Sequence, residues 1–387
     1  MIKNVRLKVF LQDTVFAVLS EINKRMQHNP KVIMLYSNLG FRDNIKALYD
    51  YLIKEKYFEK YTIICSTNDY KNFIGEKYPN VKFISNVAGV KQYFSAGYVF
   101  YCFGKLPILP GKQQEVTQIW HGTPFKAADK GVLEGHSWKK HYYTHVVSPA
   151  HNFDKIMSHW FSMPVDSMIV DGYPRCDALF EPSPNYDFGK YKKLILWAPT
   201  FRKSKITGYS DVKNVSDNIL PVVSNDKFIE LNSYLKERGV KLVAKLHPLQ
   251  DIDYSKLKEL DHLVLLSHKQ FTDRGMDLYR LMKQADALIT DYSSIFFDYL
   301  LLDRPIGFTE DDMNDYGDDR GFEVDDVDAY RPGEKIKTMD DLKLFIDHIA
   351  NNIDGFESDR QRVIKLSNDY TKGEYSKRLL DVLGIIK

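Results

Sequence analysis

The chain has 387 residues, of which 44% are hydrophobic and 27% charged, a balance typical of a folded protein with room for two α/β domains. Its 54 Lys and Arg against 52 Asp and Glu leave a net charge of only +2, which argues against a nucleic-acid binder, because such proteins usually carry a clear basic excess. Cys65, Cys102 and Cys176 are odd in number and form no C-x-x-C pair, which argues against a disulfide framework and favours a reducing compartment.

The first predicted element is an amphipathic helix over residues 5–26. Four charged residues, Lys8, Asp13, Glu21 and Lys24, interrupt its apolar positions, so it lacks the run of about 20 mostly apolar residues that a membrane span needs. Two interpretations stay open. The apolar side packs on the helix's own domain, or the helix lies on an anionic membrane surface with basic residues near its ends.

Short runs rich in Val, Ile, Tyr and Phe alternate with helical stretches in the first half of the chain. Such continuous apolar runs are typical of buried parallel strands, and residues 44–52 show the spacing of a connecting helix. The predicted strands are residues 32–36, 61–65, 81–84, 98–103, 116–120, 145–148 and, more briefly, 168–170.

A second array follows a linker at residues 181–189, EPSPNYDFG, where prolines, a glycine and polar residues break the pattern. We therefore predict an α/β fold of two Rossmann-like, doubly wound domains facing a cleft, over residues 1–180 and 191–387, joined by a linker at 181–190. Ligands of such sheets bind beyond the carboxyl ends of the strands, so polar motifs there are the candidates. The later predicted strands are 194–198, 241–246, 263–266, 287–290 and 305–308, and the helices are 226–238, 277–285 and 293–302.

The first candidate motif is Gln118-Ile-Trp-His-Gly-Thr-Pro-Phe-Lys126, at the end of an apolar strand. Gly122 permits a tight turn, and Thr123 and Pro124 suit the cap and the first turn of a helix. His121 is thus predicted at a strand terminus beside a helix N-terminus, where an imidazole can act as a general base near neutral pH. The alternative is a histidine satisfied within the turn.

Two further motifs follow predicted strands in the second half. In Lys245-Leu-His-Pro248, the strand delivers His247, which can stabilise charge on a transferring phosphate or simply stack under a loop. In Ile289-Thr-Asp-Tyr-Ser-Ser294, hydroxyls and free N–H groups at a helix start suit a diphosphate. Plain capping by Asp291 or Ser293 is the alternative. Asp298, one turn further on, either accepts hydrogen bonds from a ribose or is solvated.

Two weaker motifs contain arginines. In Trp197-Ala-Pro-Thr-Phe-Arg202, the guanidinium can bind phosphate oxygens bidentately, although an ordinary surface arginine is the equal alternative. The turn Asp171-Gly-Tyr-Pro-Arg-Cys-Asp177 follows a short strand and is unusually dense in Gly, Pro, Arg and Asp. Alone it is weak evidence for a site.

Together these motifs resemble the CDP-glycerol glycerophosphotransferase family, the teichoic acid polymerases and primases. The match covers about residues 118–322, over half the chain, and the motifs are specific jointly rather than singly. The segments that carry it are His121-Gly-Thr-Pro, Gly172-Tyr-Pro-Arg-Cys-Asp177, Ala198-Pro-Thr-Phe-Arg202, Lys245-Leu-His-Pro248, Thr290-Asp-Tyr-Ser-Ser294 and Arg320-Gly-Phe322.

The resemblance implies a GT-B-like fold, with the acceptor side in the first domain and the CDP-donor in the second. It implies that His121 is the base that activates the acceptor hydroxyl and that His247 acts at the donor phosphates. The hydroxyl then attacks the donor β-phosphorus in line and releases CMP. The other expected donor phosphate or nucleotide residues are Arg202, Lys245, Thr290, Asp291, Ser293, Ser294 and Asp298, and those of the acceptor side or cleft are Thr123, Lys126 and Arg175.

The implied partners are a CDP-polyol donor, a prenyl-diphosphate-linked or polymer acceptor, and the cytoplasmic face of the cell membrane, where the protein is expected to be peripheral. No cofactor or metal ligand is predicted, with Mg²⁺ left open. His136, His141 and His145 lack acidic or thiol partners at ligand spacing. Glycerol versus ribitol and teichoic acid versus capsule stay undecided. Two rivals stay open: a GT-B glycosyltransferase using a nucleotide sugar, and a non-catalytic membrane-surface scaffold.

Overall fold

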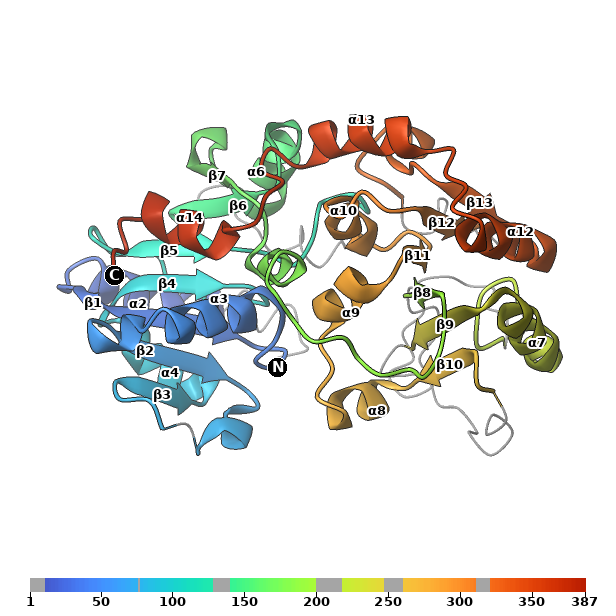
Figure 1. The fold of residues 1–387 in the computed structure, drawn as a ribbon. Helices are drawn as coiled ribbons and strands as arrows, with labels where there is room; N and C mark the ends of the chain where they lie inside the picture. The colour runs from blue at the N-terminus through green and yellow to red at the C-terminus, as the bar shows by residue number, and fades with distance from the viewer. Residues whose placement is uncertain (1–10, 76, 128–139, 200–217, 247–259, 311–320) are drawn as a thin grey trace. The chain divides into compact units, whose positions relative to one another are not determined.

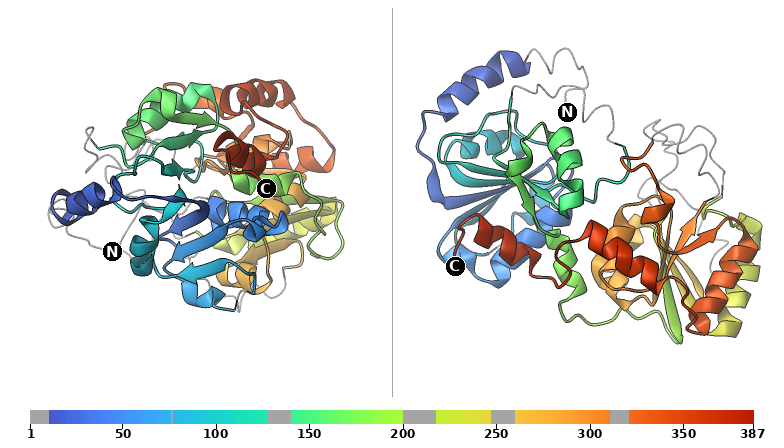
Figure 2. Two further views of the ribbon diagram at one scale, coloured as in Figure 1. Left: turned by 90° about the vertical axis from the view of Figure 1, so that its left-hand side faces the viewer. Right: turned by 90° about the horizontal axis from the view of Figure 1, so that it is seen from above.

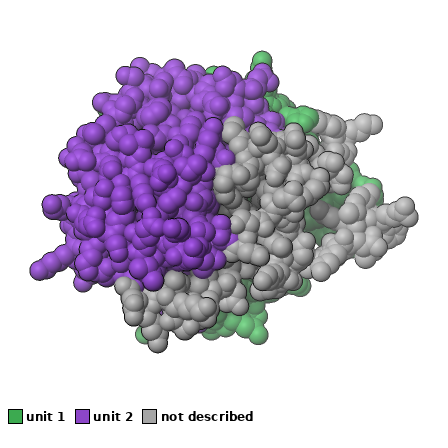
Figure 3. Space-filling model, turned by 90° about the vertical axis from the view of Figure 1, so that its right-hand side faces the viewer, with its two compact units in different colours: residues 1–123, 128–177, 368–387 green, residues 124–127, 178–367 purple. Residues whose placement is uncertain are grey.

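The computed structural model describes residues 11–75, 77–127, 140–199, 218–246, 260–310 and 321–387. The chain forms two compact units, which are coloured separately in Figure 3. The first comprises residues 1–123, 128–177 and 368–387, and the second comprises residues 124–127 and 178–367. Each unit is an α/β structure with its own parallel sheet (Figure 1).

The first unit is built on a seven-stranded sheet in the order β3-β2-β1-β4-β5-β6-β7, with parallel pairing throughout. The sequence prediction of these strands is confirmed, with shifts at their ends. Central residues such as Ile33 and Val99 are fully buried because helices pack on the sheet, which explains the continuous apolar runs. The strands are β1 Asn29–Ser37, β2 Thr62–Thr67, β3 Val81–Ile84, β4 Ala96–Tyr101, β5 Glu115–Gln118, β6 His145–Ser148 and β7 Met168–Val170.

The helices of the first unit follow the expected apolar periodicity. In α3, Ile45, Leu48, Tyr49 and Leu52 fall on one buried face, as the spacing predicted. The helices are α2 Val15–Asn23, α3 Asp43–Lys54, α4 Asn86–Tyr93, α6 Asp154–Phe161 and α14 Tyr375–Val382, with 3₁₀ turns η1 Tyr57–Glu59, η2 Tyr70–Phe73, η3 His151–Phe153, η4 Val165–Ser167 and η5 Pro174–Leu179.

Helix α2 contacts its unit through polar side chains. The Ser20 hydroxyl accepts a hydrogen bond from the Leu109 amide at 3.0 Å, and the Asn23 amide donates to the Leu109 carbonyl at 2.9 Å and to Gln114 Oε1 at 2.8 Å. The apolar residues of this helix divide into two groups, because Phe16 and Leu19 are half-buried whereas four others face outward. They are Val15, Val18, Ile22 and, just beyond the helix, Met26, which are 43–62% exposed.

The second unit is built on a six-stranded parallel sheet in the order β10-β9-β8-β11-β12-β13. Its edge strand β13, with the charged sequence Glu-Lys-Ile, was not predicted, because it lacks the apolar run of the inner strands. The elements are β8 Lys193–Trp197, β9 Val240–Lys245, β10 Leu263–Leu266, β11 Ala287–Thr290, β12 Ile306–Thr309, β13 Glu334–Ile336, α7 Phe228–Arg238, α8 His268–Asp273, α9 Leu278–Gln284, α10 Ile295–Leu300, α12 Met339–Ala350 and α13 Glu357–Ser367, with η6 Asn225–Lys227 and η8 Asp328–Tyr330.

Both sheets reverse their strand order once, which makes them doubly wound (Figure 2). The chain adds strands in one direction from β1 to β3 and then in the other from β4, and it repeats this with β8 to β10 and β11 to β13. The predicted α/β class with two doubly wound sheets is therefore confirmed. The switch points lie between β1 and β4 in one sheet and between β8 and β11 in the other, and such points are where ligands of this fold class bind.

The C-terminal segment belongs to the first unit, whereas the predicted second domain extended to residue 387. Three contacts explain the difference. Asp177 accepts hydrogen bonds from the amides of Tyr375 and Ser376 at the start of α14, at 2.8 and 2.9 Å. Arg378 forms a 2.7 Å ion pair with Asp171. Burial outweighs this pairing and raises the pKa of Asp171 to about 7. The turn Asp171–Asp177 thus docks the C-terminal helix.

Replacement of Gly172 by Ala should loosen this docking. A Cβ atom at Gly172 would lie 2.2 Å from Cε1 of Tyr375, whose side chain is fully buried. We expect Gly172→Ala to lower the free energy of unfolding by about 1–3 kcal/mol, the usual cost of overpacking, measured by urea denaturation. The control is Gly75→Ala, where a Cβ meets nothing within 4 Å. It should change stability by no more than about 0.5 kcal/mol. Equal effects would contradict the packing argument.

Candidate functional site

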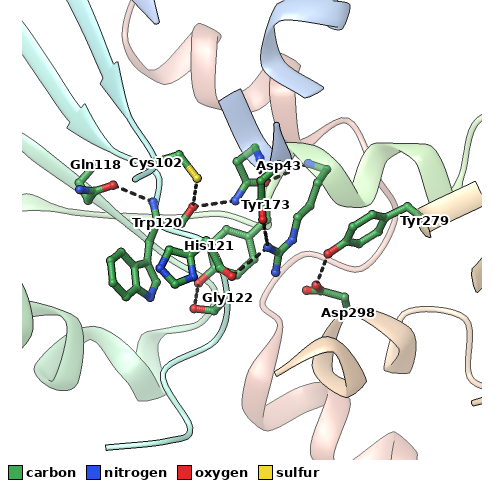
Figure 4. Close-up of polar contacts among 11 residues, drawn as sticks. Asp43, Cys102, Gln118, Trp120, His121, Gly122, Tyr173, Tyr279 and Asp298 are labelled. Carbon is green, nitrogen blue, oxygen red and sulfur yellow. Dashed lines mark hydrogen bonds and ion pairs between the residues drawn. The ribbon is translucent and has the colours of Figure 1, made fainter. Parts of the chain in front are cut away.

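His121 lies just beyond β5, at the carboxyl edge of the first sheet, and is half-buried. Its ring stacks on Phe103, with centroids 4.7 Å apart and planes at 19°, and contacts Trp120, with centroids 3.9 Å apart. Figure 4 shows the histidine beside Trp120, at the end of the segment that leaves Gln118. The imidazole is therefore held between two aromatic rings in the turn that follows the strand.

The backbone of this turn is strained and supported by side chains from other segments. Trp120 has a φ of +66°, a left-handed conformation that costs a bulky residue about 1–3 kcal/mol and persists only where its surroundings impose it. Three successive carbonyl groups accept hydrogen bonds at 2.8–3.0 Å (Figure 4). The donors are Asn44 and Cys102 to Trp120, Arg175 to His121, and Tyr173 to Gly122.

Burial lowers the pKa of His121 to about 4. The carboxylate of Asp43 acts in the opposite direction, and the guanidinium groups of Arg175 and Arg42 lower the pKa further. The imidazole is therefore unprotonated at neutral pH and free to accept a proton, as a general base must be. Aromatic faces pack against the ring, and a hydrogen bond with the backbone of His121 itself acts to raise its pKa.

The residues after His121 do not form the expected helix. Pro124–Ala127 belong to the second unit and run as an extended segment, where Lys126 pairs with Phe322 in an antiparallel bridge. Thr123 is buried, but it caps no helix at Pro124. The physical reason is that Phe125 is fully buried among aromatic side chains of the second unit. Its ring neighbours are Phe296, Phe297, Phe322 and Tyr330.

The predicted Thr290–Ser294 segment lies at the switch point of the second sheet. Thr290 ends β11, and its hydroxyl donates to the Ala198 carbonyl at the end of β8, at 2.8 Å. Asp291 is buried and accepts the Ser293 amide at 3.1 Å, a local turn bond that precedes α10 and caps no amide of the helix itself. Ser293 and Ser294 are half-buried, and Ser294 stands before α10 without a side-chain capping bond. The two hydroxyl groups are thus placed where ligands bind in this fold class.

Two other predicted donor residues lie in the same unit. Asp298 on α10 is only 3% exposed, so the solvated alternative is wrong, and its Oδ2 accepts a 2.7 Å hydrogen bond from the Tyr279 hydroxyl (Figure 4). Lys245 ends β9, and its ammonium group lies 5.4 Å from the ring centroid of Phe271.

Some predictions fall outside the described residues. These are the roles of His247 and Arg202 and the position of His136. Of the three histidines considered above as metal ligands, His141 and His145 are among the described residues. His145 pairs with Glu115, its Nδ1 lying 3.2 Å from the carboxylate. Among the described residues, no group of three or more His, Cys, Asp or Glu is arranged to hold a metal ion, and no helix there is long and apolar enough to cross a membrane.

Sequence reasoning missed most of the residues that support His121. Arg175 was expected at the acceptor side or cleft, and the structure places it beneath the His121 turn, buried against Asp43. Asp43 and Asn44 follow β1 just as His121 follows β5. The rule that polar residues beyond strand ends are candidates would therefore have selected them as well.

Comparison with known proteins identifies relatives over almost the whole chain. The model of a family described as CDP-Glycerol:Poly(glycerophosphate) glycerophosphotransferase matches residues 18–384. The teichoic acid poly(ribitol-phosphate) polymerase of Bacillus spizizenii is 26% identical over 92% of this chain and 56% of its own length. The teichoic acid poly(glycerol phosphate) polymerase of the same species is 27% identical over 84% of this chain and 85% of its own. The chain thus spans little more than half of the first relative.

A solved structure supports the fold assignment. The wall teichoic acid polymerase TagF, in a variant soaked with CDPG, superimposes with a TM-score of 0.71 at 20% sequence identity, over 98% of this chain and 96% of that one. The likeness establishes a shared fold of the GT-B type.

The low pKa of His121 predicts how the stability of the protein depends on pH. Between the ordinary pKa of 6.5 and about 4, the unfolded chain binds a proton at this histidine that the folded chain does not. The free energy of unfolding therefore falls as the pH falls through this window. We expect His121→Asn to lose less stability than the wild type between about pH 7 and about pH 5, measured by urea denaturation.

A second histidine gives a control of opposite sign. Asp154 raises the pKa of His151, so this histidine contributes stability at low pH that is lost as the pH rises through its folded pKa. His151→Asn should therefore lose more stability than the wild type on acidification. A His121→Asn curve parallel to that of the wild type would contradict the burial argument.

Proposed function

The chain belongs to the CDP-glycerol:poly(glycerophosphate) glycerophosphotransferase family, and we propose on this premise that it transfers a polyol-phosphate unit from a CDP-polyol to a hydroxyl group of a teichoic acid or capsule polymer. The observation that carries the proposal is the unprotonated His121 in its supported turn at the carboxyl edge of the first sheet. In the second unit, the Lys245–Pro248 motif begins at the last residue of β9, and the Thr290–Ser294 motif begins at the last residue of β11.

In the proposed reaction, the acceptor hydroxyl gives its proton to His121 as its oxygen attacks the donor β-phosphorus. The new bond joins this oxygen to the β-phosphorus, the bond from the β-phosphorus to the bridging oxygen breaks, and CMP leaves with that oxygen and its negative charge. A neutral imidazole is required at the start. Displacement at phosphorus asks the protein mainly for positioning and charge stabilisation.

Donor binding is proposed for the second unit. The hydroxyl groups of Ser293 and Ser294 are candidates for the diphosphate, because they stand at the switch point between β8 and β11. Thr290 and Asp291 shape that turn. Asp298 lies on the following helix, α10, and accepts a hydrogen bond from Tyr279 on α9. His247, Arg202 and Lys245 are proposed as further phosphate contacts on the strength of their motifs. The relatives include both a ribitol-phosphate and a glycerol-phosphate polymerase, so either polyol is a candidate.

Nucleotide release tests this proposal. Purified protein would receive CDP-glycerol, CDP-ribitol or a UDP-sugar, each with a prenyl-diphosphate-linked acceptor, and release of the nucleoside phosphate would be measured. We expect CMP from one CDP-polyol and a loss of about 10²–10⁴-fold in kcat for His121→Ala, the usual contribution of a general base. Ser293→Ala with Ser294→Ala should instead raise the KM for the donor.

The other outcomes each decide a rival. Turnover of the UDP-sugar alone would replace the proposal with a glycosyltransferase, and full activity of His121→Ala would remove the proposed base. The length of the product separates the addition of one unit from chain extension.

We also propose that the protein binds peripherally to the anionic cytoplasmic face of the membrane, where its polymer acceptor would be anchored. The support is an outward apolar stripe formed by Val15, Val18 and Ile22 of α2 and by Met26 just beyond it. The polar side chains of Ser20 and Asn23 on the same helix contact the unit. A surface hollow beside this stripe is lined by Lys24, Arg25, Met26, Lys112 and Gln113. Apolar side chains next to basic groups are the features with which helices lie in a lipid interface.

Flotation with vesicles tests this surface. We expect wild-type protein to float with phosphatidylglycerol vesicles at low salt, and the double variant Val18→Glu/Ile22→Glu to bind at least about tenfold more weakly, since it loses two inserted apolar side chains. The matched control is Val382→Glu, an equally exposed apolar residue on α14, which should bind as the wild type does. Equal binding by all three proteins would overturn the proposed membrane contact of the α2 stripe.

A further inference from the structure

An ion pair at the carboxyl edge of the first sheet joins three segments that are far apart in sequence. Asp43 begins α3 after β1, Arg175 lies in η5 after β7, and His121 follows β5. We infer that Asp43 and Arg175 form a positioning pair that holds the backbone of His121, so that its imidazole is presented to the acceptor hydroxyl. The inference rests on the proposed role of His121 as the base.

One nitrogen atom carries the connection. Arg175 Nη1 lies 2.9 and 3.1 Å from the two carboxylate oxygens of Asp43, and it donates to the His121 carbonyl at 2.9 Å. The side chain of Arg175 is 8% exposed and that of Asp43 is 22% exposed. A charge-assisted contact that is largely shielded from water holds its geometry more strongly than an exposed pair does.

A second pair of hydrogen bonds closes the arrangement. The backbone amide of Arg175 donates to Asn44 Oδ1 at 3.1 Å, and Asn44 Nδ2 donates to the Trp120 carbonyl at 2.8 Å. Adjacent residues at the start of α3 therefore hold both Arg175 and the residue before His121. Because Trp120 is in the left-handed region at a φ of +66°, the turn depends on such contacts to keep its conformation.

The two charges of the pair act in opposite directions on the imidazole. Asp43 raises the pKa of His121 and Arg175 lowers it, so the two charges act against each other on the ring. Removal of one partner leaves the other charge buried and unopposed. Asp43→Asn should therefore lower the pKa of His121 and Arg175→Met should raise it, whereas the double variant should lie close to the wild type. These opposite shifts test that both charges lie beside the ring, and the fall in kcat tests their positioning role.

The experiment combines NMR titration of ¹³C-labelled histidine with steady-state kinetics on the full chain. The variants are Asp43→Asn, Arg175→Met, their combination, and Arg175→Lys. The His121 resonance is assigned by its absence in His121→Asn. We expect the opposite pKa shifts described above and a fall of about 10–100-fold in kcat for Arg175→Met, with an unchanged KM for the donor, because small misplacements of a catalytic group cost rates of this order. Arg175→Lys should recover part of kcat, since the contacts use a single nitrogen that an ammonium group can replace.

Arg378→Met is the matched control. It breaks another shielded Arg–Asp pair of the same unit, the 2.7 Å contact with Asp171, which does not touch the His121 turn. It should lower stability without moving the pKa of His121. If Arg175→Met does not fold, Asp43→Asn and Arg175→Lys still decide, through the pKa of His121 and kcat respectively.

The outcomes separate this inference from the proposed reaction. Opposite pKa shifts in a protein that releases no CMP from any CDP-polyol would keep the pair as the support of His121 and overturn the reaction. Loss of CMP release in His121→Ala, together with unchanged pKa and kcat in folded Asp43→Asn and Arg175→Met, would overturn the positioning role and keep the reaction. If Asp43→Asn and Arg175→Met shift the pKa of His121 no more than Arg378→Met does, the positioning role is likewise overturned.

Discussion

Parallel pairing of the strands is the constraint on which the placement of the candidate functional residues depends. In each sheet every strand points the same way, so the segments that follow the strands all emerge at one edge. This brings residues from after β1, β5 and β7 into contact around His121, although 132 positions separate Asp43 from Arg175. In the second unit, the same rule brings the ends of β8 and β11 together through Thr290 and Ala198.

The His121 turn shows how the proposed base is kept both unprotonated and fixed. The aromatic rings of Phe103 and Trp120 pack against the imidazole, and partial burial of this kind lowers the pKa of a histidine. The same rings offer no hydrogen bonds, so the turn is held through its backbone carbonyl groups instead. Side chains can thus fix the position of the base without occupying its ring nitrogens.

The path of the chain links the two units through the motif that contains His121. His121–Thr123 belong to the first unit, and Pro124–Ala127 belong to the second, where Phe125 is buried among aromatic side chains. The C-terminal residues 368–387 return to the first unit, where Asp171 and Asp177 bind α14. The motif Asp171–Asp177 therefore serves two purposes. Its two aspartates bind α14, and Arg175 between them supports His121.

The sequence by itself determined the fold class, most strands, the order of the motifs and the position of His121 at a strand end. These features are local, because apolar runs and turn residues specify strands and their termini. Only the tertiary structure decided that Arg175 binds Asp43, that Phe125 forms part of the second unit and that one apolar stripe of α2 faces outward. The physical reason is that pairing and burial depend on segments distant in sequence, and periodicity alone does not reveal which side of a helix meets them.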